Sequence, residues 1–452
     1  MYPAEGMIKL VSGRIVLTKI CTDYEKSDLI FLSLLLLNEL KYEMQMKKLV
    51  ILLIFLMFFI FHAFTQTQAL FFQRILPNKI DLIDENFWRA PYDSVSTPHT
   101  SNSYLIGNSI TFNLLGDSHL HLKQLLEKVL SLSETTSIPV HIHLDGQNWI
   151  AARPDLWNWF DPSIPGYNPE NRKNVEWTSW TPDSAVKVCW RDWGQQIRVL
   201  PAPNIASPAI LNAHYEAYDL LLPIIIKWIK HLPAAKKYLF GGIRIGWEAG
   251  INYNAYYYKN GNEIFDKHPS TTEYDPKGRT TTENFSLDSN TLRLGYAAAS
   301  TSNIQTEGEL TNAVYEKIVH RYVETLCRYV TNFGFTPKEL FTHIGGNYAP
   351  FDKHLKFWPA INRYATPGWS FYSMDPSSAG SLSDELKTAG LSQWAASEWL
   401  WPGQTSDEWC EHLRKTYSFK DCRLLVIYNW EFMIDRDVIA QKGIRKFLSG
   451  SS

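Results

Sequence analysis

The chain has 452 residues, of which 44 are Lys or Arg and 46 are Asp or Glu, giving a formal net charge of −2. No basic block occurs, and a chain without one is not expected to bind nucleic acid. The length fits either one large α/β barrel or two ordinary domains.

The cysteines argue against one class of site. The five cysteines form neither a C-x-x-C motif nor a Cys/His cluster, so a structural zinc site is not expected. In an exported protein Cys410 and Cys422 are candidates for a disulfide, although the sequence alone does not establish the bond. We assign no metal and no cofactor to the chain.

The N-terminal region contains the features of an export signal. Met46-Lys47-Lys48 forms a basic start, Leu49–Ala63 is apolar, and a polar run follows. This order predicts a signal peptide over residues 46–68. The apolar run is shorter than the roughly 20 residues that a membrane-spanning helix needs. An uncleaved membrane anchor is the alternative interpretation.

Residues 1–45 lack the turn and core signals of a domain. We therefore expect Met44 or Met46 to be the true start, with residues 1–45 a mis-assigned extension. On either interpretation of the apolar run, residues 69–452 form one domain outside the cytoplasm. We expect a secreted, periplasmic or cell-surface protein that meets a membrane only through an uncleaved N-terminal segment.

Strands and helices are expected to alternate through the rest of the chain. Residues 70–100 are irregular and contain proline, so we predict no element there. Short apolar runs bounded by turn residues predict strands, and apolar residues at helical spacing predict helices. The expected strands cover residues 104–112, 138–144, 242–246, 340–344, 369–372, 391–396 and 423–428. The expected helices cover residues 120–132, 210–232, 309–333 and 409–417, with a kink at Pro223.

This alternation predicts a (β/α)₈ TIM barrel, because polar and aromatic residues follow the carboxyl end of each strand. The pattern contains seven strands, so the first strand is degenerate or missing. Residues 153–180 form a long loop dense in tryptophan, which we interpret as a wall of a cleft. Residues 260–302 are polar and rich in turns, as in a lid or a solvated insertion.

Two glutamates follow strands in similar surroundings. Glu248 lies in the run GGIRIGWEAGINYNAYYY, and Glu398 lies among Trp394, Trp399 and Trp401. A pair of carboxyl groups is what hydrolysis of a glycosidic bond requires, one to protonate the leaving oxygen and one to attack or to activate water. Walls of tryptophan exclude water and raise the pKa of a carboxyl group. Either glutamate alone is equally well explained as a structural ion pair or a helix cap.

Aromatic and amide side chains near the expected strand ends suit sugars, which present apolar faces and hydroxyl edges. Tyr348 or Tyr428 is expected to donate a hydrogen bond to the attacking carboxylate and keep it ionised. The predicted substrate-binding residues are Asp145, Gln147, Asn148, Trp149, Trp190, Asn252, Tyr256, Asn347, Tyr348, Trp399, Trp401, Tyr428 and Trp430.

Residues 104–447 resemble the clan-A glycoside hydrolases, in which the acid/base glutamate ends strand four and the nucleophile ends strand seven. Glu248 and Glu398 match these positions and their three-strand interval, and Trp430 resembles the aromatic residue after strand eight. The resemblance implies a retaining hydrolase of poly- or oligosaccharides, with carboxyl groups about 5–5.5 Å apart. One departure is Trp247, because the clan usually has Asn before the acid/base glutamate. The resemblance does not identify a family within the clan.

Three alternatives compete with this interpretation. The aromatic residues suit a non-catalytic carbohydrate-binding barrel equally well. His141, His143, Asp145 and His343 weakly resemble the zinc ligands of barrel amidohydrolases, although the two histidines of the 138–144 strand are also explained as interior residues bonded to the backbone or to Asp145. A third alternative gives a catalytic role to Glu431 or Asp375, which also follow strands.

Overall fold

The computed structural model describes residues 68–96, 104–187, 189–192, 196–199, 201–251, 293–345 and 356–450, together with two short paired strands, β1 (Leu10–Val11) and β2 (Arg14–Ile15). The chain divides into two compact units, residues 1–66 and 67–452. All that follows concerns the second unit. The expected signal peptide lies outside the described residues, apart from Gln68, where the first barrel strand begins. Within the described part of the chain, no helix has the length and apolar character needed to cross a bilayer.

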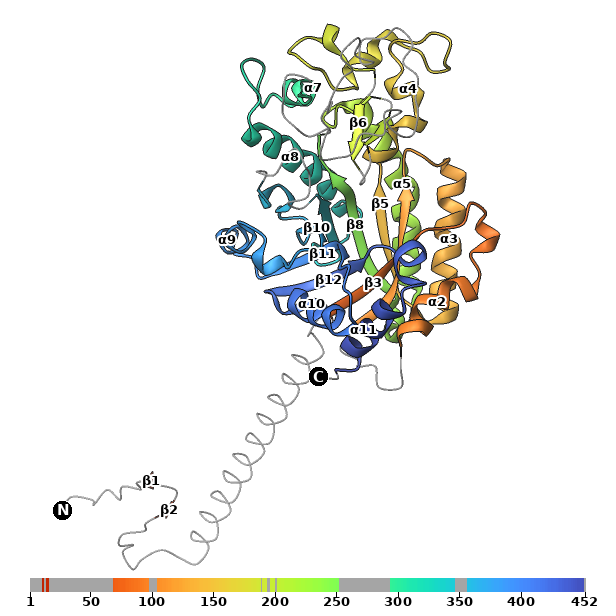
Figure 1. Ribbon diagram of the computed structural model, residues 1–452, viewed down its shortest axis with the longest axis vertical. Coiled ribbons are helices and arrows are strands. Elements are labelled where there is room, and N and C mark those ends of the chain that lie inside the picture. Colours follow the sequence, from red (N-terminus) through yellow and green to blue (C-terminus); the bar gives the residue numbers. More distant parts are fainter. Residues whose placement is uncertain are drawn as a thin grey trace, which may run out of the picture. The chain divides into compact units, whose positions relative to one another are not determined.

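Eight parallel strands close into a barrel (Figure 1). Each strand pairs with the next along the chain, and the last pairs with the first, from Leu424 opposite Ala69 to Ile427 opposite Phe72. The architecture is the predicted (β/α)₈ barrel. In chain order the strands are β3 (Gln68–Arg74), β4 (Tyr104–Asn113), β5 (Val140–Asp145), β8 (Phe240–Ala249), β9 (Leu340–Ile344), β10 (Gly368–Tyr372), β11 (Gln393–Leu400) and β12 (Asp421–Ile427).

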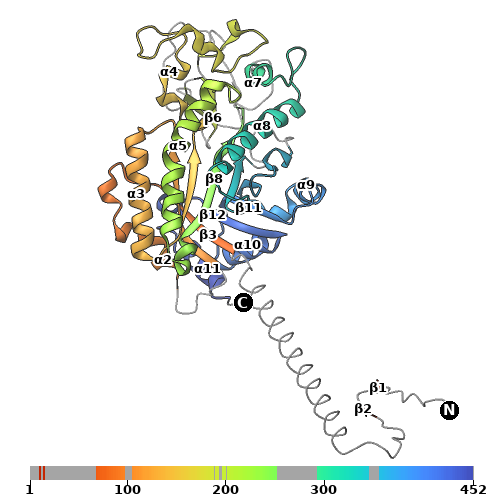
Figure 2. The ribbon, with the colours of Figure 1, turned by 180° about the vertical axis from the view of Figure 1, so that it is seen from behind.

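Helices cover the outside of the barrel, as the two opposite views show (Figures 1 and 2). Side chains of Asp84, Ser118 and Asp437 cap helix N-termini, and Thr405 forms a capping box with Glu408. Such caps satisfy backbone N–H groups that lack partners within the helix. The helices are α2 (Glu85–Val95), α3 (His119–Thr136), α5 (Pro208–His231), α7 (Tyr296–Thr301), α8 (Asn312–Thr331), α9 (Leu382–Thr388), α10 (Ser406–Ser418) and α11 (Val438–Leu448).

The prediction that residues 70–100 contain no helix or strand is wrong. This stretch holds β3, a 3₁₀ turn (Ile80–Leu82) and α2, and β3 is the first barrel strand missing from the sequence pattern. Strands buried on both faces read as continuous apolar runs rather than alternating ones. The apolar run Ala69–Phe72 also directly follows the expected signal peptide, so it has no turn signal in front of it.

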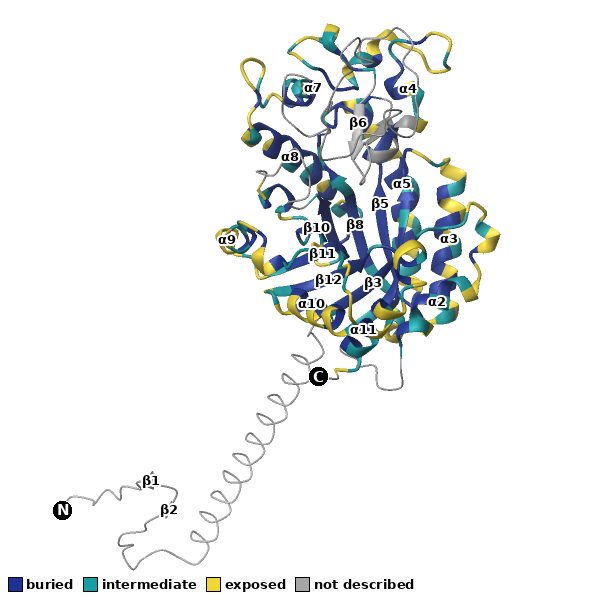
Figure 3. Cartoon of the chain, viewed as in Figure 1, coloured by how far each residue is buried: buried dark blue, intermediate teal, exposed yellow. Residues whose placement is uncertain are grey.

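The barrel strands are buried along most of their length (Figure 3), and the core has two layers, one on each side of these strands. Outward-facing strand residues pack against the helices in one large cluster. Inward-facing residues such as Phe71, Phe341 and Val426 form a small separate cluster. Toward the carboxyl ends of the strands, the inward-facing positions become polar, with Gln73, His143 and others fully buried. This polar layer lies directly beneath the candidate site.

The long connection from β5 to α5 has a hydrophobic core of its own. Trp157 and Trp177 are buried in it with Leu156, Val175 and Ile210. These two tryptophans hold the connection together, which corrects the expectation that they face a cleft. The connection consists of η2 (Gln147–Ala152), α4 (Pro154–Trp157), η3 (Pro169–Lys173), η4 (Pro182–Ser184), β6 (Cys189–Asp192) and β7 (Gln196–Val199). Figure 1 shows α4, β6 and α7 together beyond the carboxyl ends of β5 and β8.

Candidate active site

The two glutamates lie on the fourth and seventh strands of the barrel, β8 and β11. The strands are parallel, so both residues lie at the carboxyl end of the barrel, where TIM-barrel enzymes have their active sites. Glu398 is buried, with 1% of its surface exposed, whereas Glu248 is half-buried.

An irregularity of β8 places Glu248. Ile245 pairs with Thr342 and Ala249 with Ile344, so three residues of β8 lie opposite the single residue His343. Within this bulge Gly246 has φ 81° and Glu248 has φ 47°. Left-handed backbone is uncommon for a residue with a side chain, and such outliers cluster at functional sites.

A second bulge places Glu398. Trp369 pairs with Ala396 and Ser370 with Glu398, which leaves Ser397 as an extra residue in β11. The Ser397 hydroxyl donates to the Thr342 carbonyl at 2.7 Å. Bulges redirect side chains and occur often beside active sites. Each glutamate therefore owes its direction to a bulge.

Side chains from other strands contact Glu398. The Tyr372 hydroxyl on β10 donates to Glu398 Oε1, and Arg244 Nη1 lies 4.0 Å from Glu398 Oε2. The hydrogen bond expected from Tyr348 or Tyr428 therefore comes from Tyr372 among the described residues. The ring of Tyr428 lies edge-on to that of Tyr372, with centroids 6.0 Å apart. Tyr348 lies outside the described residues.

The charges of the two glutamates act on each other and on the same neighbouring side chains. Burial raises the pKa of Glu398 to about 8, and the negative charge of Glu248 acts in the same direction. Arg244 and the hydrogen bonds of Tyr372 and Trp247 lower that pKa. The charges of both glutamates also act on Tyr372, as well as on Arg244 and Tyr428. Both carboxyl groups therefore influence the same small set of side chains.

Arg244 is the buried cation of this region. Its Nη1 donates to the Ser397 carbonyl, and its Nη2 donates to Gln73 Oε1 at 2.8 Å. Nη2 also lies 2.6 Å from Nδ1 of His143. Burial lowers the pKa of Arg244 to about 10, while the nearby acids Glu398 and Asp145 raise it. The side chain therefore stays positively charged at neutral pH.

The interior histidines bond to their neighbours in the barrel wall. His141 lies 2.9 Å from Ser109 Oγ through Nδ1, and His343 lies 2.8 Å from Ser370 Oγ through Nε2. His143 Nε2 lies 2.7 Å from the Gly246 carbonyl oxygen. Among the described residues, no group of three His, Cys, Asp or Glu side chains is arranged to hold a metal ion. The hydrogen bonds of His141, His143 and His343 are those expected of interior histidines.

No family model matches this sequence, and no curated protein matches it. Similar solved structures include the catalytic domain of a family 26 endo-β-1,4-mannanase from Bacillus sp. JAMB-750, with 12% identity, a TM-score of 0.37 and coverage of 85% of each chain. A broad-specificity GH5 endoglucanase from an uncultured bacterium has 9% identity and a TM-score of 0.36, covering 81% of this chain and 84% of that one. A family 5 glycoside hydrolase from Prevotella bryantii B14 has 8% identity and a TM-score of 0.35, covering 85% and 95%. At such identities the function has to be inferred from the site itself.

Two of the predicted sugar contacts lie where β5 ends. Asp145 is fully buried, and its charge acts on Arg244. The side chain of Gln147 exchanges two hydrogen bonds with the backbone of Gly250, accepting from its N–H at 3.3 Å and donating to its carbonyl. Gln147 therefore ties the connection after β5 to the end of β8, close to Glu248.

Two predicted stacking rings belong to the protein core. Trp399 is 1% exposed and donates to Thr416 Oγ1 at 3.1 Å. Trp430 is 2% exposed and packs edge-on against Phe72 at 5.3 Å. Successive residues of a strand face opposite sides, so Trp399 points away from the face that carries Glu398. These contacts correct the expectation that the two rings stack on sugars.

The other predicted contacts are described in part or not at all. Trp401 is half-buried and stacks on His412, with centroids 3.3 Å apart and ring planes at 15°. The side chains of Asn148, Trp149 and Trp190 are not described, although their backbone lies in η2 and β6. Asn252, Tyr256, Asn347 and Tyr348 lie outside the described residues.

The other two acids that follow strands have structural partners, whereas the two cysteines expected to pair do not form a disulfide. Glu431 binds Arg74 at 2.8 Å and accepts from the Ile75 N–H, and Asp375 caps a 3₁₀ turn. These bonds give both acids a structural role. Cys410 and Cys422 are buried free thiols.

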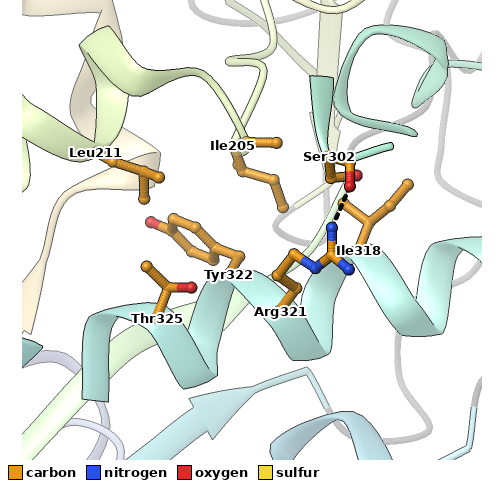
Figure 4. Close-up of a pocket in the computed structure, with 8 residues that line it drawn as sticks. Ile205, Leu211, Ser302, Ile318, Arg321, Tyr322 and Thr325 are labelled. Carbon is orange, nitrogen blue, oxygen red and sulfur yellow. Dashed lines mark hydrogen bonds between the residues drawn. The ribbon is translucent and has the colours of Figure 1, made fainter. Parts of the chain in front are cut away.

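A separate cavity of about 90 Å³ lies on the flank of the barrel, between α5 and α8 (Figure 4). Ile205, Leu211, Ile318 and Tyr322 line it, and Arg321 donates to the Ser302 carbonyl at its edge. It shares no lining residue with the surroundings of the two glutamates, and we assign it no role.

Proposed function

We propose that this protein is a retaining glycoside hydrolase in which Glu248 is the general acid/base and Glu398 is the nucleophile. The observation that carries the proposal is that the charges of both carboxyl groups act on Arg244 and Tyr372, at the carboxyl end of the barrel. Glycosidases of both stereochemical classes use such a pair.

In the first step Glu398 attacks the anomeric carbon while Glu248 protonates the departing oxygen. A glycosyl ester then forms on Glu398, and the leaving alcohol diffuses away. In the second step Glu248, now ionised, takes a proton from water, and the water oxygen displaces Glu398. The sugar product keeps the anomeric configuration of the substrate, and both carboxyl groups return to their starting state.

The pair needs one proton in total, held on Glu248 at the moment of attack. Burial and the charge of Glu248 favour a protonated Glu398 in the empty site. Three groups oppose this, because Arg244, Tyr372 and Trp247 stabilise the anion of Glu398. Coupled acids titrate as a pair, and the reactive state holds a single proton. In the empty site burial outweighs the donors and favours that proton on Glu398. Attack goes through the form with the proton on Glu248, which Arg244, Tyr372 and Trp247 favour.

The experiment is hydrolysis of a panel of 4-nitrophenyl glycosides and polysaccharides by the wild type, Glu248→Gln and Glu398→Gln. Nuclear magnetic resonance of the first-formed product establishes whether the anomeric configuration is retained. We expect retention, loss of activity of Glu398→Gln on every substrate, and loss of activity of Glu248→Gln on the polysaccharides, whose leaving groups need a proton. Full activity of Glu398→Gln on a true substrate removes the assignment, and an inverted first product removes the double displacement.

One observation favours a second candidate, a carbohydrate-binding barrel without turnover. Glu398 is 1% exposed and its pKa is raised to about 8, so the empty site offers a mainly neutral and covered carboxyl group. Sugar binding by calorimetry, with no hydrolysis across the same panel, would identify this function.

We further propose that the substrate is a poly- or oligosaccharide and that the protein meets it outside the cytoplasm. The support for this location is the apolar segment Leu49–Ala63, which follows a basic start as in an export signal. Mass spectrometry of the protein recovered from the culture medium or periplasm tests this, with a mature N-terminus close to residue 68 expected. Recovery only from the cytoplasm at full length contradicts it.

A further inference from the structure

Two buried side chains beneath the glutamates form a path of successive contacts, which links the surroundings of Glu398 to the backbone near Glu248. Arg244 on β8 and His143 on β5 are both 0% exposed. Arg244 Nη2 lies 2.6 Å from His143 Nδ1, and His143 Nε2 lies 2.7 Å from the carbonyl oxygen of Gly246. The path runs from a cation beside Glu398 to the backbone that presents Glu248.

The chemistry of Arg244 decides which nitrogen of His143 carries the proton. A guanidinium group donates hydrogen bonds and accepts none, so Nδ1 of His143 must be an acceptor. Burial and the charge of Arg244 lower the pKa of His143 well below its usual range, and the ring is neutral. Its one proton is therefore on Nε2, which donates to the Gly246 carbonyl. Thr111 Oγ1 also lies 2.9 Å from Nδ1, but a hydroxyl both donates and accepts, so the tautomer is fixed by Arg244.

The acceptor at the end of this path belongs to the β8 bulge. Gly246 begins the three unpaired residues, and Glu248 ends them with φ 47°. Left-handed backbone of this kind persists only where surrounding contacts hold it. The bond from His143 is such a contact, because it holds the carbonyl of Gly246 toward β5.

Arg244 acts in the same way on the β11 bulge. Its Nη1 donates to the carbonyl of Ser397, the extra residue of that bulge, and lies 4.0 Å from Glu398 Oε2. The Gln73 amide oxygen holds Nη2 at 2.8 Å. One buried cation therefore contacts the backbone beside Glu398 directly and the backbone beside Glu248 through His143.

We propose that Arg244 and His143 are positioning residues that hold Glu248 and Glu398 in mutual alignment by fixing the two bulges. The inference rests on the proposed function for its kinetic consequences. It assigns neither residue a contact with the sugar, since both act through the glutamates and the backbone that carries them.

His143→Phe tests the path, with His141→Phe as the matched control. His141 lies on the same strand and face, is equally buried, and bonds to Ser109 rather than to the bulge. A misplacement of about 1 Å can cost roughly 100-fold, so we expect kcat of His143→Phe to fall to that extent with KM little changed. His141→Phe should keep a kcat close to that of the wild type. His143→Gln, which retains one acceptor and one donor, should recover most of the loss.

Arg244→Met tests the cation through the pH profile, a readout that a purely space-filling role does not move. Arg244 lowers the pKa of Glu398, so its loss should move the alkaline limb of kcat/KM to higher pH. Arg244→Lys keeps the charge but loses the planar fork. Arg244→Lys should lower kcat without moving the alkaline limb of kcat/KM. It is the variant to use if Arg244→Met does not fold.

The outcomes separate the inference from the proposed function. If His143→Phe and His141→Phe lose the same fraction of kcat, the inference is overturned. The proposed function still stands in that case, provided that Glu248→Gln and Glu398→Gln are impaired. Thermal unfolding against pH gives a readout without turnover. The pKa of Glu398, raised to about 8 in the folded protein, makes wild-type stability decline up to that pH. In Arg244→Met the decline should continue to higher pH, and an unchanged decline overturns the inference even where no hydrolysis is detected.

Discussion

Two buried glutamates of this protein have a pKa raised to the same value, but their surroundings differ. Burial raises the pKa of both Glu398 and Glu176 to about 8. Glu176, in the connection between β5 and α5, accepts backbone N–H bonds from Gly295 at 2.9 Å and Ala297 at 3.2 Å. Glu398 instead meets side chains of other strands, among them Tyr372 and Arg244.

The difference shows that a shifted pKa does not by itself mark an active site. Perturbed acids are candidates for functional sites, but structural networks shift pKa values as well. Backbone donors tie Glu176 to the start of α7, which is a structural role. Glu398 shares its neighbours with a second acid, Glu248, and that shared set of neighbours is what points to chemistry.

The largest expected effect is on Glu398→Gln. Loss of the nucleophile should lower kcat by roughly 10⁴-fold or more, since covalent catalysis is removed. The pKa is raised in the folded protein, so the wild type gains stability from Glu398 below its unfolded pKa and loses it as pH rises through about 8. Gln has nearly the same shape as Glu and does not ionise, so the variant does not lose stability at this position as the pH rises. The variant should therefore unfold at a higher temperature than the wild type at pH 8. Lower stability at every pH contradicts the account.

The next effect in size is on Glu248→Gln. Removing a general acid should cost about 10²–10⁴-fold on substrates with poor leaving groups. Aryl glycosides whose leaving group needs no proton should lose far less in the first step. Comparing 2,4-dinitrophenyl and alkyl glycosides of one sugar measures the difference. Equal losses on both substrates would assign Glu248 another role.

Tyr372→Phe should have a moderate effect. It removes the hydroxyl that donates to Glu398 Oε1, a bond to a charged group worth about 1.5–3 kcal/mol. We expect kcat to fall by roughly 10- to 100-fold, with the pKa of Glu398 raised further. Tyr417→Phe is the control, because Tyr417 bonds to the Ala69 carbonyl at 2.8 Å on the outer side of the barrel. An equal loss in both variants would mean that Tyr372 acts only through stability.

The smallest effect on activity is expected from Glu176→Ala. It leaves the backbone N–H groups of Gly295 and Ala297 without their acceptor, so stability should fall by about 2–4 kcal/mol. The kcat of the folded variant should equal that of the wild type. Urea unfolding combined with steady-state kinetics separates the two quantities. A large fall in kcat without a loss of stability would give Glu176 a part in the reaction and remove the contrast with Glu398.

The pH profile tests the shared proton. The charged and titratable groups facing Glu398 are Glu248 and Arg244 from β8, Tyr372 from β10 and Tyr428 beyond β12. The singly protonated pair is lost as pH rises through about 8, so kcat/KM should fall on the alkaline side near that pH. A profile that is flat from pH 7 to pH 10 would contradict a shared proton.

The sequence predicted the parts of the fold that have local signals. The strand before Glu248, the strand 340–344 and the helix expected over residues 120–132 all lie where predicted. β3 escaped prediction because its short apolar run directly follows the expected signal peptide, with no turn residue in front of it to mark the start of a strand.

The neighbours of Glu398 were less predictable, because they come from strands far apart in the sequence. Tyr372 ends an expected strand but carries no local mark of its partner. Arg244 had a usable signal, since a charged residue inside an apolar strand must face a polar barrel interior or another charge. His141 and His143 alternate and thus share one face, which was visible. What distinguishes His143 from His141 is its hydrogen bond to the carbonyl of Gly246 in the β8 bulge, and the sequence does not show that bulge.

The most direct measurement of the central claim is to trap the covalent intermediate. An activated 2-deoxy-2-fluoro glycoside of the preferred sugar slows the second step, and peptide mass spectrometry then locates the modified residue. The account predicts a single glycosyl ester on Glu398 in the wild type and none in Glu398→Gln. An adduct on another residue, or steady turnover of the natural glycoside with no adduct formed, would contradict it.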